Sequence, residues 1–556
     1  MAQGTQPLAA INASEPAWWH GAVIYQVYPR SLLDSKGDGI GDLPGITRKL
    51  DYIRDLGVDA IWVSPFFRSP MKDFGYDVSD YRAVDPMFGT LADFDALIER
   101  AHRLGLRVII DQVLSHTSDQ HPWFEESRRS RDNDQADWYV WADPKPDGTP
   151  PNNWLSIFGG SAWEWESRRQ QYYLHNFLAS QPDLNFHCRD VVDVMLDNVR
   201  FWLDRGVDGM RLDAVGYCFH DAQLRDNPAK PEAERVGQGF RIDNPYAFQR
   251  HVHDITQPEN LGFLAELRAL LDRYGAVSLG EITAEDTRAT IAQYTRGEER
   301  LHTAYSFELL SDDFDAATIR EAVEGLDSQL DNGWACWAVG NHDVARVATR
   351  WGGARANDAL AKVIAAALLS LRGCACIYQG DELGLTEAEI PREAVRDPYG
   401  IAFWPTFKGR DGCRTPMPWT AAEATAGFTD GEPWLPIEAG HRARAVDVQE
   451  GDASSVLSFY RQFLAWRKHL PELQWGTIDF VTGEGDRLAF VREHEGRRLF
   501  CCFNFGPEPA RFTLPGGRHT LIDLAAAPPV TVQLGAVELP AWGMAFLAAP
   551  GDDASA

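Results

Sequence analysis

Residues 191–215 read VVDVMLDNVRFWLDRGVDGMRLDAV, and this stretch decides the fold. From Val191 to Trp202 the apolar side chains recur at a helical period, which predicts a helix that ends just before Gly206. After the glycine an apolar run reaches Asp213, as is typical of a strand that is buried on both faces. The sequence therefore predicts a helix, a glycine turn and a parallel strand in immediate succession.

The same succession recurs elsewhere in the chain. The apolar runs VDAIWVSP, LRVIIDQV and AVSLGEIT follow Gly57, Gly105 and Gly275. Four further expected strands, at residues 22–28, 303–307, 335–340 and 374–378, bring the total to eight. We therefore expect an α/β fold, a (β/α)₈ TIM barrel, with a doubly wound open sheet as the alternative.

The spacing of these glycines indicates an insertion after the third strand. Gly57 and Gly105 lie 48 residues apart, whereas Gly105 and Gly206 lie 101 residues apart. The additional residues, about fifty when judged against an ordinary β/α unit, form a small domain. The expected insertion, residues 117–187, holds six of the nineteen Trp residues, which suit either contacts to sugar rings or a small core.

The C-terminal part of the chain changes to short runs separated by Gly, Pro, Asp or Asn. TIDFV, RLAFV, RLFCCF, ARFTL and VTVQL predict a terminal antiparallel β-sandwich. We therefore expect three domains: the barrel at residues 1–116 and 188–470, the inserted domain at 117–187, and the β-sandwich at 471–556.

Composition excludes several classes of function. The 556 residues carry a formal net charge of −28, which repels nucleic acid and anionic lipid surfaces. No apolar stretch approaches the roughly 20 residues that span a bilayer, and the first residues lack a signal-peptide pattern. Eight Cys without a CxxC motif predict reduced thiols. We expect a cytoplasmic protein that binds neither nucleic acid nor a membrane.

Four acidic side chains fall where expected barrel strands end. Asp111, Asp213 and Glu281 end the third, fourth and fifth strands, and Asp343 follows the seventh. Active sites of (β/α)₈ barrels lie at this rim. Four acids that converge there would repel one another unless a function required them.

Two of these acids have the pattern of a retaining glycosidase pair. Arg211 and Asp213 are two residues apart on one face of a strand, and we expect the guanidinium to keep Asp213 ionised as a nucleophile. Glu281, kept protonated by burial and nearby negative charge, is the natural acid partner. His116 and His342 follow strands at the same rim, where each either donates to sugar hydroxyls or serves a structural role.

Several ordered motifs carry a resemblance to a known family. They are residues 111–116 (DQVLSH), 181–185 (QPDLN), 209–213 (GMRLD), 280–282 (GEI) and 340–343 (GNHD), with further similarity at 22–31, 75–81, 158–163 and 410–419. This set resembles the signature regions of glycoside hydrolase family 13, the α-amylase superfamily, in the form typical of its α-glucosidase and oligo-1,6-glucosidase branch. The resemblance spans about residues 18–550.

The resemblance implies a role for each matching residue. Asp213 would be the nucleophile, Glu281 the general acid/base, and Asp343 the third carboxylate, which grips the 2- and 3-hydroxyls of the sugar. Ser115 stands where the family usually has Asn, a departure that affects a supporting hydrogen bond and no catalytic step. The implied substrate-binding residues are Tyr76, Asp77, His116, Phe158, Phe177, Gln181, Arg211, His342 and Arg414.

Residues 34–42, DSKGDGIGD, resemble the calcium loop of the family. The resemblance implies Asp34, Asp38, Ile40 and Asp42 as ligands of a structural Ca²⁺, which prefers oxygen ligands. Lys36 stands where relatives place Asn or Asp, and its ammonium either takes the place of the metal or points outward. The alternative is a Gly-rich turn with Asx hydrogen bonds. No organic cofactor is implied.

Ala214 and the loop that follows it indicate the substrate. Relatives that act on α-1,6 bonds typically carry Val after the nucleophile, whereas those that act on α-1,4 bonds carry something smaller or Thr. Residues 219–228 resemble the loop of bacterial α-glucosidases that act on short α-1,4-linked substrates and often transfer glucose to other alcohols. The resemblance implies an exo-acting α-glucosidase for small α-glucosides such as maltose.

Two alternatives stay open. One is a glucosyl transferase or isomerase on the same scaffold, similar to trehalose synthase or active on sucrose. The other is a non-catalytic accessory subunit of a membrane transporter, which would lack the catalytic acids and carry a membrane span.

Overall fold

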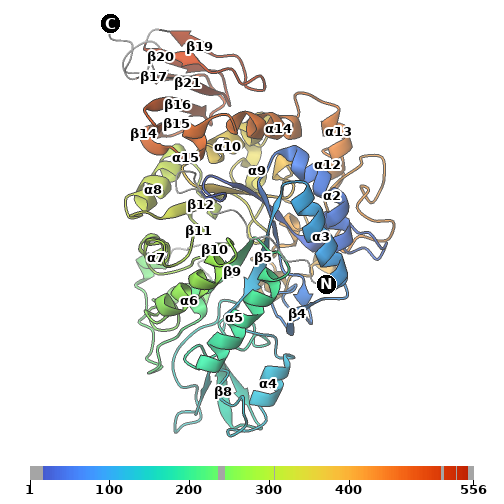
Figure 1. Ribbon diagram of the computed structural model, residues 1–556, viewed down its shortest axis with the longest axis vertical. Helices are drawn as coiled ribbons and strands as arrows, with labels where there is room; N and C mark the ends of the chain where they lie inside the picture. Colours follow the sequence, from blue (N-terminus) through green and yellow to red (C-terminus); the bar gives the residue numbers. More distant parts are fainter. Residues whose placement is uncertain (1–16, 236–243, 306, 515–518, 534, 549–556) are drawn as a thin grey trace, which may run out of the picture.

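Eight parallel strands close a barrel within the described part of the protein. The computed structural model describes residues 17–235, 244–305, 307–514, 519–533 and 535–548 (Figure 1). Around the barrel the strands follow the order β1-β13-β12-β11-β10-β9-β5-β2. Their bounds are β1 Val23–Val27, β2 Ala60–Val63, β5 Arg107–Val113, β9 Gly209–Asp213, β10 Val277–Glu281, β11 Thr303–Tyr305, β12 Trp334–Ala338 and β13 Cys374–Tyr378. The eight expected strands are confirmed, and the open sheet is wrong.

Helices between successive strands cover the outside of the barrel (Figure 1). The longer ones are α2 Leu43–Leu56, α3 Leu91–Arg103, α5 Arg189–Leu203, α6 Asn260–Asp272, α7 Thr287–Tyr294, α8 Ala316–Asp327, α10 Asp358–Leu368 and α14 Val456–Arg467. The shorter ones are α1 Pro29–Leu32, α9 Val347–Arg350, α11 Pro398–Phe403, α12 Ala439–Arg442, α13 Val446–Glu450 and α15 Pro471–Trp475.

The chain around Gly206 shows why a strand follows a helix at once. Helix α5 buries one face, which includes Met195 and Trp202. Gly206 has a φ of 92°, in the left-handed region, and a Cβ there would lie 3.1 Å from a methyl carbon of Ile98. Glycine therefore permits both the reversal and the close approach. The next residues form β9, which is buried along its whole length.

Large side chains fill the barrel interior. Trp62, Val277 and Tyr305 belong to one buried cluster, and Trp18 and Trp19 pack against it from before β1. The barrel is therefore a packed core and not a channel. The polar side chains at the strand ends lie at the edge of this packed core.

The insertion after β5 forms a small domain with a sheet of its own. Its elements are helix α4 Pro122–Ser127 and strands β6 Trp141–Ala142, β7 Trp163–Glu166 and β8 Gln171–Leu174, in the order β6-β8-β7; a separate hairpin, β3 Phe67–Arg68 with β4 Asp80–Val84, precedes it. Trp154 and Trp163 are buried and stack on each other, whereas Trp165 is 41% exposed. Core packing therefore accounts for Trp154 and Trp163.

Two antiparallel sheets form the C-terminal part of the described chain. One has the order β14-β15-β16-β21-β18 and the other β17-β20-β19. Their bounds are β14 Thr477–Glu484, β15 Arg487–His494, β16 Arg497–Asn504, β17 Ala510–Thr513, β18 Thr520–Leu521, β19 Thr531–Gln533, β20 Ala536–Leu539 and β21 Met544–Ala548. Val491 and Leu547 of the first sheet share a buried cluster with Phe512 and Val537 of the second, so the expected β-sandwich is confirmed.

Arg492 of β15 joins this sandwich to the barrel. Its side chain is fully buried and donates to carbonyl oxygens from two parts of the chain. The acceptors are Ser370 and Leu371 after α10, and Leu473, Gly476 and Thr477 at the start of the sandwich. Burial lowers the pKa of Arg492 to about 9. In Figure 1 the sandwich lies at one end of the molecule, next to α8, α10 and α15.

The domain boundaries stay predictions. The parts of the expected domains at residues 1–16 and 549–556 lie outside the described residues. Helix α5, the first barrel helix after the insertion, begins at Arg189, and β14, the first strand of the sandwich, begins at Thr477.

All eight cysteines are free thiols, as expected, and seven of them are buried. Within the described ranges, no helix has the length and apolar character that crossing a membrane requires.

Candidate active site

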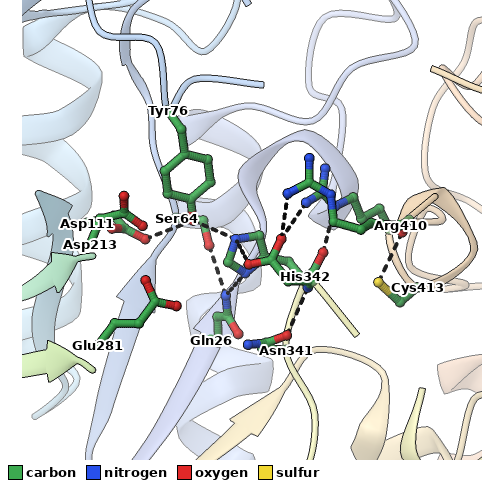
Figure 2. A network of polar contacts seen from close by, with 12 residues as sticks. Gln26, Ser64, Tyr76, Asp111, Asp213, Glu281, Asn341, His342, Arg410 and Cys413 are labelled. Carbon is green, nitrogen blue, oxygen red and sulfur yellow. Dashed lines mark hydrogen bonds and ion pairs between the residues drawn. The ribbon is translucent and has the colours of Figure 1, made fainter. Parts of the chain in front are cut away.

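The four expected acids meet at the carboxyl-terminal rim of the barrel. Asp111 lies in β5, Asp213 ends β9, Glu281 ends β10, and Asp343 follows β12. Asp111, Asp213 and Glu281 are buried, and Figure 2 shows their carboxyl groups close together beside Tyr76. The convergence predicted from strand ends is confirmed.

Arg211 is the centre of this cluster. Its Nη1 donates to Oδ1 of Asp213 at 2.5 Å and to Oδ1 of Asp111 at 2.9 Å. Its Nη2 lies 2.6 Å from Oε1 of Glu281 and donates to the hydroxyl of Tyr305, which in turn donates to Glu281 at 3.2 Å. The side chain is fully buried. A single guanidinium therefore bridges three carboxyl groups.

Burial controls the protonation of these acids. It raises the pKa of Asp213 to about 7 and the pKa of Glu281 to about 7, although Arg211 opposes both shifts. Burial also raises the pKa of Asp111 to about 6. Arg211 favours the ionised form of Asp213, in the expected direction, whereas burial and the charges of Asp111 and Asp343 favour the protonated form. The pKa values of both acids of the expected pair are therefore shifted upward from those of free carboxyl groups, toward the range in which general acid/base groups work best.

Asp343 lies among positive charges instead. Its Oδ1 accepts from Arg414 at 2.7 Å and from Arg410 at 3.0 Å, and its Oδ2 lies 3.2 Å from Nε2 of His342. Burial alone would raise the pKa of Asp343, but the guanidinium groups of Arg410 and Arg414 hold it well below its usual range. Asp343 is therefore ionised, and its contact with sugar hydroxyls stays a prediction.

Arg410 is a residue that the sequence interpretation missed. Besides Asp343, its guanidinium contacts Asp73 at 3.1 Å and Asp397 at 2.7 Å, and it lies over the ring of Phe158 at 5.9 Å. The only signal is its place at the head of the motif at residues 410–419, which also contains Arg414. In the structure both Arg410 and Arg414 contact Asp343. The sequence alone does not show which arginine of this motif reaches the acids.

His342 links the acids through Tyr76 (Figure 2). The amide nitrogen of Gln26 donates to Nδ1 of His342 at 2.8 Å, which leaves the proton of the neutral ring on Nε2. That nitrogen lies 2.6 Å from the hydroxyl of Tyr76, and the hydroxyl donates to Asp111 at 3.2 Å. Burial lowers the pKa of His342 to about 3, so the ring is neutral. Tyr76 and His342 therefore lie where they were expected, beside the acids.

His116 has its own set of partners. Its Nδ1 lies 2.9 Å from the hydroxyl of Ser115, and its Nε2 lies 3.0 Å from the carbonyl oxygen of Tyr76 and 3.3 Å from the amide of Gln181. The ring of Phe177 lies 4.9 Å away. Burial lowers the pKa of His116 to about 4. Ser115 thus supplies a hydrogen bond although it replaces the usual Asn.

Asp77 and Phe158 have contacts with residues other than Asp111, Asp213 and Glu281. The carboxylate of Asp77 is fully buried and accepts from the hydroxyl of Ser69 and from the backbone N–H groups of Lys72 and Asp73. Phe158 packs edge to face with Tyr399 at 5.3 Å. Their expected contacts with substrate stay predictions.

The backbone at Ala214 is unusual. Its φ is 41° and its ψ is 45°, in the left-handed region that non-glycine residues seldom adopt. Its N–H donates to Oε2 of Glu281 at 3.1 Å. The residue after one expected catalytic acid therefore touches the other.

The loop at residues 34–42 is held by its own hydrogen bonds. Asp34 accepts from the backbone N–H groups of Lys36, Gly37 and Gly39 and from the hydroxyl of Thr429. Both carboxylate oxygens of Asp34 are used in this way. This pattern is that of an Asx turn.

Lys36 lies among the expected calcium ligands. Its Nζ is 3.4 Å from Oδ2 of Asp38 and donates to the carbonyl oxygen of Met87 at 2.6 Å. Asp42 accepts from the backbone and the hydroxyl of Ser35. In the part of the chain that the structure describes, no three His, Cys, Asp or Glu side chains are arranged to hold a metal ion. These contacts fit a turn better than a calcium site, and calcium here stays a prediction for metal analysis of the purified protein.

The chain matches the model of the alpha amylase catalytic domain over residues 26–476. It belongs to glycoside hydrolase family 13. Within this family it is 56% identical over 534 residues to the probable alpha-glucosidase of Rhizobium meliloti strain 1021, over 95% of this chain and 96% of the relative. It is 37% identical over 543 residues to the oligo-1,6-glucosidase of Heyndrickxia coagulans, over 91% of this chain and 95% of the relative.

A solved structure is similar over almost the whole chain. That of the alpha-glucosyl transfer enzyme XgtA has a TM-score of 0.95 and 62% identity, over 96% of this chain and 100% of that chain. The family 13 chain is therefore a glycoside hydrolase and a glucosidase, and its substrates are α-glucosides. The alternative of a non-catalytic accessory subunit is wrong.

Proposed function

We propose that this family 13 enzyme is a retaining, exo-acting α-glucosidase that hydrolyses short α-1,4-linked glucosides such as maltose. The observation that carries the proposal is the bridge that Arg211 makes between Asp213 and Glu281. One guanidinium that touches both carboxyls limits their separation. It favours the retaining distance of about 5–5.5 Å over the inverting distance of about 6.5–9.5 Å.

The proposed reaction has two steps. In the first, Oδ2 of Asp213, the oxygen not bound to Arg211 Nη1, attacks the anomeric carbon while Glu281 gives its proton to the departing glycosidic oxygen. The products of this step are a glucosyl ester on Asp213 and the free aglycone. In the second, ionised Glu281 takes a proton from water as the water oxygen attacks the anomeric carbon, which releases glucose with its α-configuration and restores both acids.

The other side chains hold the glucose. Asp343, ionised by its neighbours, accepts from the 2- and 3-hydroxyls. Neutral His116 and His342 and the guanidinium of Arg414 supply donors, and Phe177 and Gln181 line the side next to His116. Tyr76, Asp77 and Phe158 complete the proposed subsite.

We include transfer of glucose to alcohol acceptors in the proposal. The support is the similarity to XgtA, a protein described as an alpha-glucosyl transfer enzyme. An alcohol would replace water in the second step without any other change to the active site. An isomerase that converts maltose or sucrose remains the second candidate, because it uses the same glucosyl ester.

Product analysis tests the proposal. Maltose, isomaltose, sucrose, trehalose and an aryl α-glucoside are supplied separately, and the products are resolved over time by NMR. We expect glucose from maltose, with the α-anomer formed first. A first-formed β-anomer would refute retention, and trehalose as the main product from maltose would identify the isomerase.

A cytoplasmic location is also part of the proposal. Its support is that all eight cysteines are free thiols, as in a reducing compartment. Cell fractionation with an antibody to the protein tests it.

A further inference from the structure

The turn after Asp213 has a strained backbone at a buried position. Ala214 lies in the left-handed region, with its methyl group packed near Tyr217, Ile255 and Phe177. An alanine avoids this region unless its surroundings hold it there, and such strain is often found at functional sites. The carbonyl oxygen of Ala214 accepts from the N–H of Tyr217 at 2.9 Å, which starts the short helix η1 Val215–Tyr217.

The same turn directs the N–H of Ala214 at Glu281. Glu281 ends the neighbouring strand β10, which pairs with β9 in parallel. Oε1 of Glu281 accepts from Arg211 and Tyr305, and Oε2 accepts from Ala214 at 3.1 Å. Each carboxyl oxygen therefore has its own donor. The donor to Oε2 is a backbone group, whose position cannot change by side-chain rotation.

We propose that Ala214 is a positioning residue for Glu281: its left-handed turn holds the N–H that fixes Oε2 of the general acid/base. The inference rests on the proposed function, which assigns that role to Glu281. It links the two strand ends, so that a shift of the turn after the nucleophile also moves the acid. The choice of side chain at residue 214 thus acts on the acid as well as on the space beside the substrate.

The N–H also affects the proton on Glu281. A donor to a carboxylate favours the ionised form, so its loss should raise the pKa of Glu281. The high-pH limb of the kcat/KM profile reports loss of the proton from this acid. This limb should therefore move to higher pH. Several other titratable or charged groups interact electrostatically with Glu281. They are Asp111, Arg211, Asp213, Tyr217, Tyr305 and Asp343. All of them are retained in the experiment below.

The experiment replaces the amide of residue 214 with an ester. Lactic acid is incorporated at position 214 by nonsense suppression, which keeps the methyl group and removes the N–H. The matched control is alanine reinstated at 214 by the same method. Kcat/KM is measured against pH for maltose, which has a poor leaving group, and for an activated aryl α-glucoside.

We expect the high-pH limb of the ester variant to move up by about half a pH unit or more. The kcat for maltose should fall several-fold more than the kcat for the aryl glucoside, because only maltose needs full protonation of its leaving group. A folded ester variant with the limb and the substrate ratio of the control would overturn the inference. If Glu281→Gln is as active as the parent on maltose, the proposed function fails instead.

Two ordinary substitutions keep the inference testable if the ester variant does not fold. Ala214→Gly retains the N–H and tolerates the left-handed turn, so its high-pH limb should match that of the parent. Ala214→Val places a β-branched residue where it is strongly disfavoured, and the limb should move in the same direction as in the ester. Equal limbs in the Gly and Val variants would contradict the inference.

Discussion

Arg410 donates to Asp343 at 3.0 Å, on the same carboxylate oxygen that Arg414 contacts at 2.7 Å. The two guanidinium groups differ in what else they hold. Arg414 also donates to the carbonyl oxygen of His342, whereas Arg410 also contacts Asp73 and Asp397. Arg414 is thus tied to the segment that carries Asp343, and Arg410 ties Asp343 to two other loops.

Arg410→Ala should weaken substrate binding more than it slows chemistry. Hydrogen bonds to a charged group contribute about 1.5–3 kcal/mol, so we expect KM for maltose to rise about tenfold or more. Asp343 keeps Arg414 as a partner, so kcat should fall less than kcat/KM. Steady-state kinetics on maltose measures both. Arg392→Ala, an exposed arginine of the same region, is the control; an equal loss in both variants would argue against a specific role.

Asp213→Asn and Glu281→Gln should separate the roles of the two acids. An amide cannot form the glucosyl ester, so Asp213→Asn should lose nearly all turnover on every substrate. Glu281→Gln should lose activity on maltose but keep part of the first step with an activated aryl glucoside, whose leaving group needs no acid. Azide should then rescue Glu281→Gln and yield α-glucosyl azide. The same azide anomer from both variants would reverse or remove the assignment.

The pH dependence of kcat/KM should be bell-shaped, with both limbs set by the buried pair Asp213 and Glu281. Because burial raises the pKa of Asp213 to about 7, protonation below this value removes the nucleophile. Because burial raises the pKa of Glu281 to about 7, ionisation above this value removes the acid. Kcat/KM should therefore fall on both sides of about pH 7. A broad plateau from pH 5 to 9, measured with maltose, would show that the two groups do not titrate as described.

Asp343→Asn should move this optimum to lower pH. The charge of Asp343 raises the pKa of both Asp213 and Glu281, so its removal should lower both values. Both limbs of kcat/KM should shift downward by about half a unit or more for an aryl glucoside, which remains measurable in a weak variant. Glu389→Gln removes an exposed acid and serves as the control. An unchanged profile in Asp343→Asn would mean that Asp343 does not act on the two acids.

The native enzyme should prefer maltose to isomaltose, and Ala214→Val should move that ratio toward isomaltose. Small changes in pocket size are worth about 1–3 kcal/mol, enough for a tenfold change in a ratio of kcat/KM values. The left-handed backbone at Ala214 adds a general loss of kcat for Val, which the ratio cancels. If the native enzyme prefers isomaltose, or if Val leaves the ratio unchanged, the determinant lies in the loop at residues 219–228.

The barrel was the more predictable part of this protein. Glycines such as Gly206 occupy turns that other residues adopt less easily, and each is followed by a continuous apolar strand. This combination is easily recognised in the sequence. The convergence of Asp213 and Glu281 followed from strand ends alone. Short pairs such as β3 with β4 were missed, since two to five residues carry little periodicity.

Other features of the site have no signal in the sequence. The left-handed conformation of Ala214 could not be predicted from the sequence, because alanine rarely adopts a positive φ and nothing about the residue type indicates one. The raised pKa of Asp213 depends on its burial and on the nearby charges of Asp111 and Asp343, which only the folded arrangement shows. In the same way, spacing could not distinguish the contacts of Arg410 from those of Arg414.

The carbonyl contacts of Arg492 have a consequence for how the molecule unfolds. This cation is buried, and its guanidinium donates to carbonyl oxygens on both sides of the domain junction. Separation of the barrel from the sandwich would break the hydrogen bonds from Arg492 to the carbonyl oxygens of Ser370 and Leu371, and a hydrogen bond to a charged group contributes about 1.5–3 kcal/mol. The two domains should therefore melt in one calorimetric transition, and a barrel cut off at residue 470 should not be a stable fragment. Chimeras that exchange the C-terminal sheets between relatives need an arginine at this place.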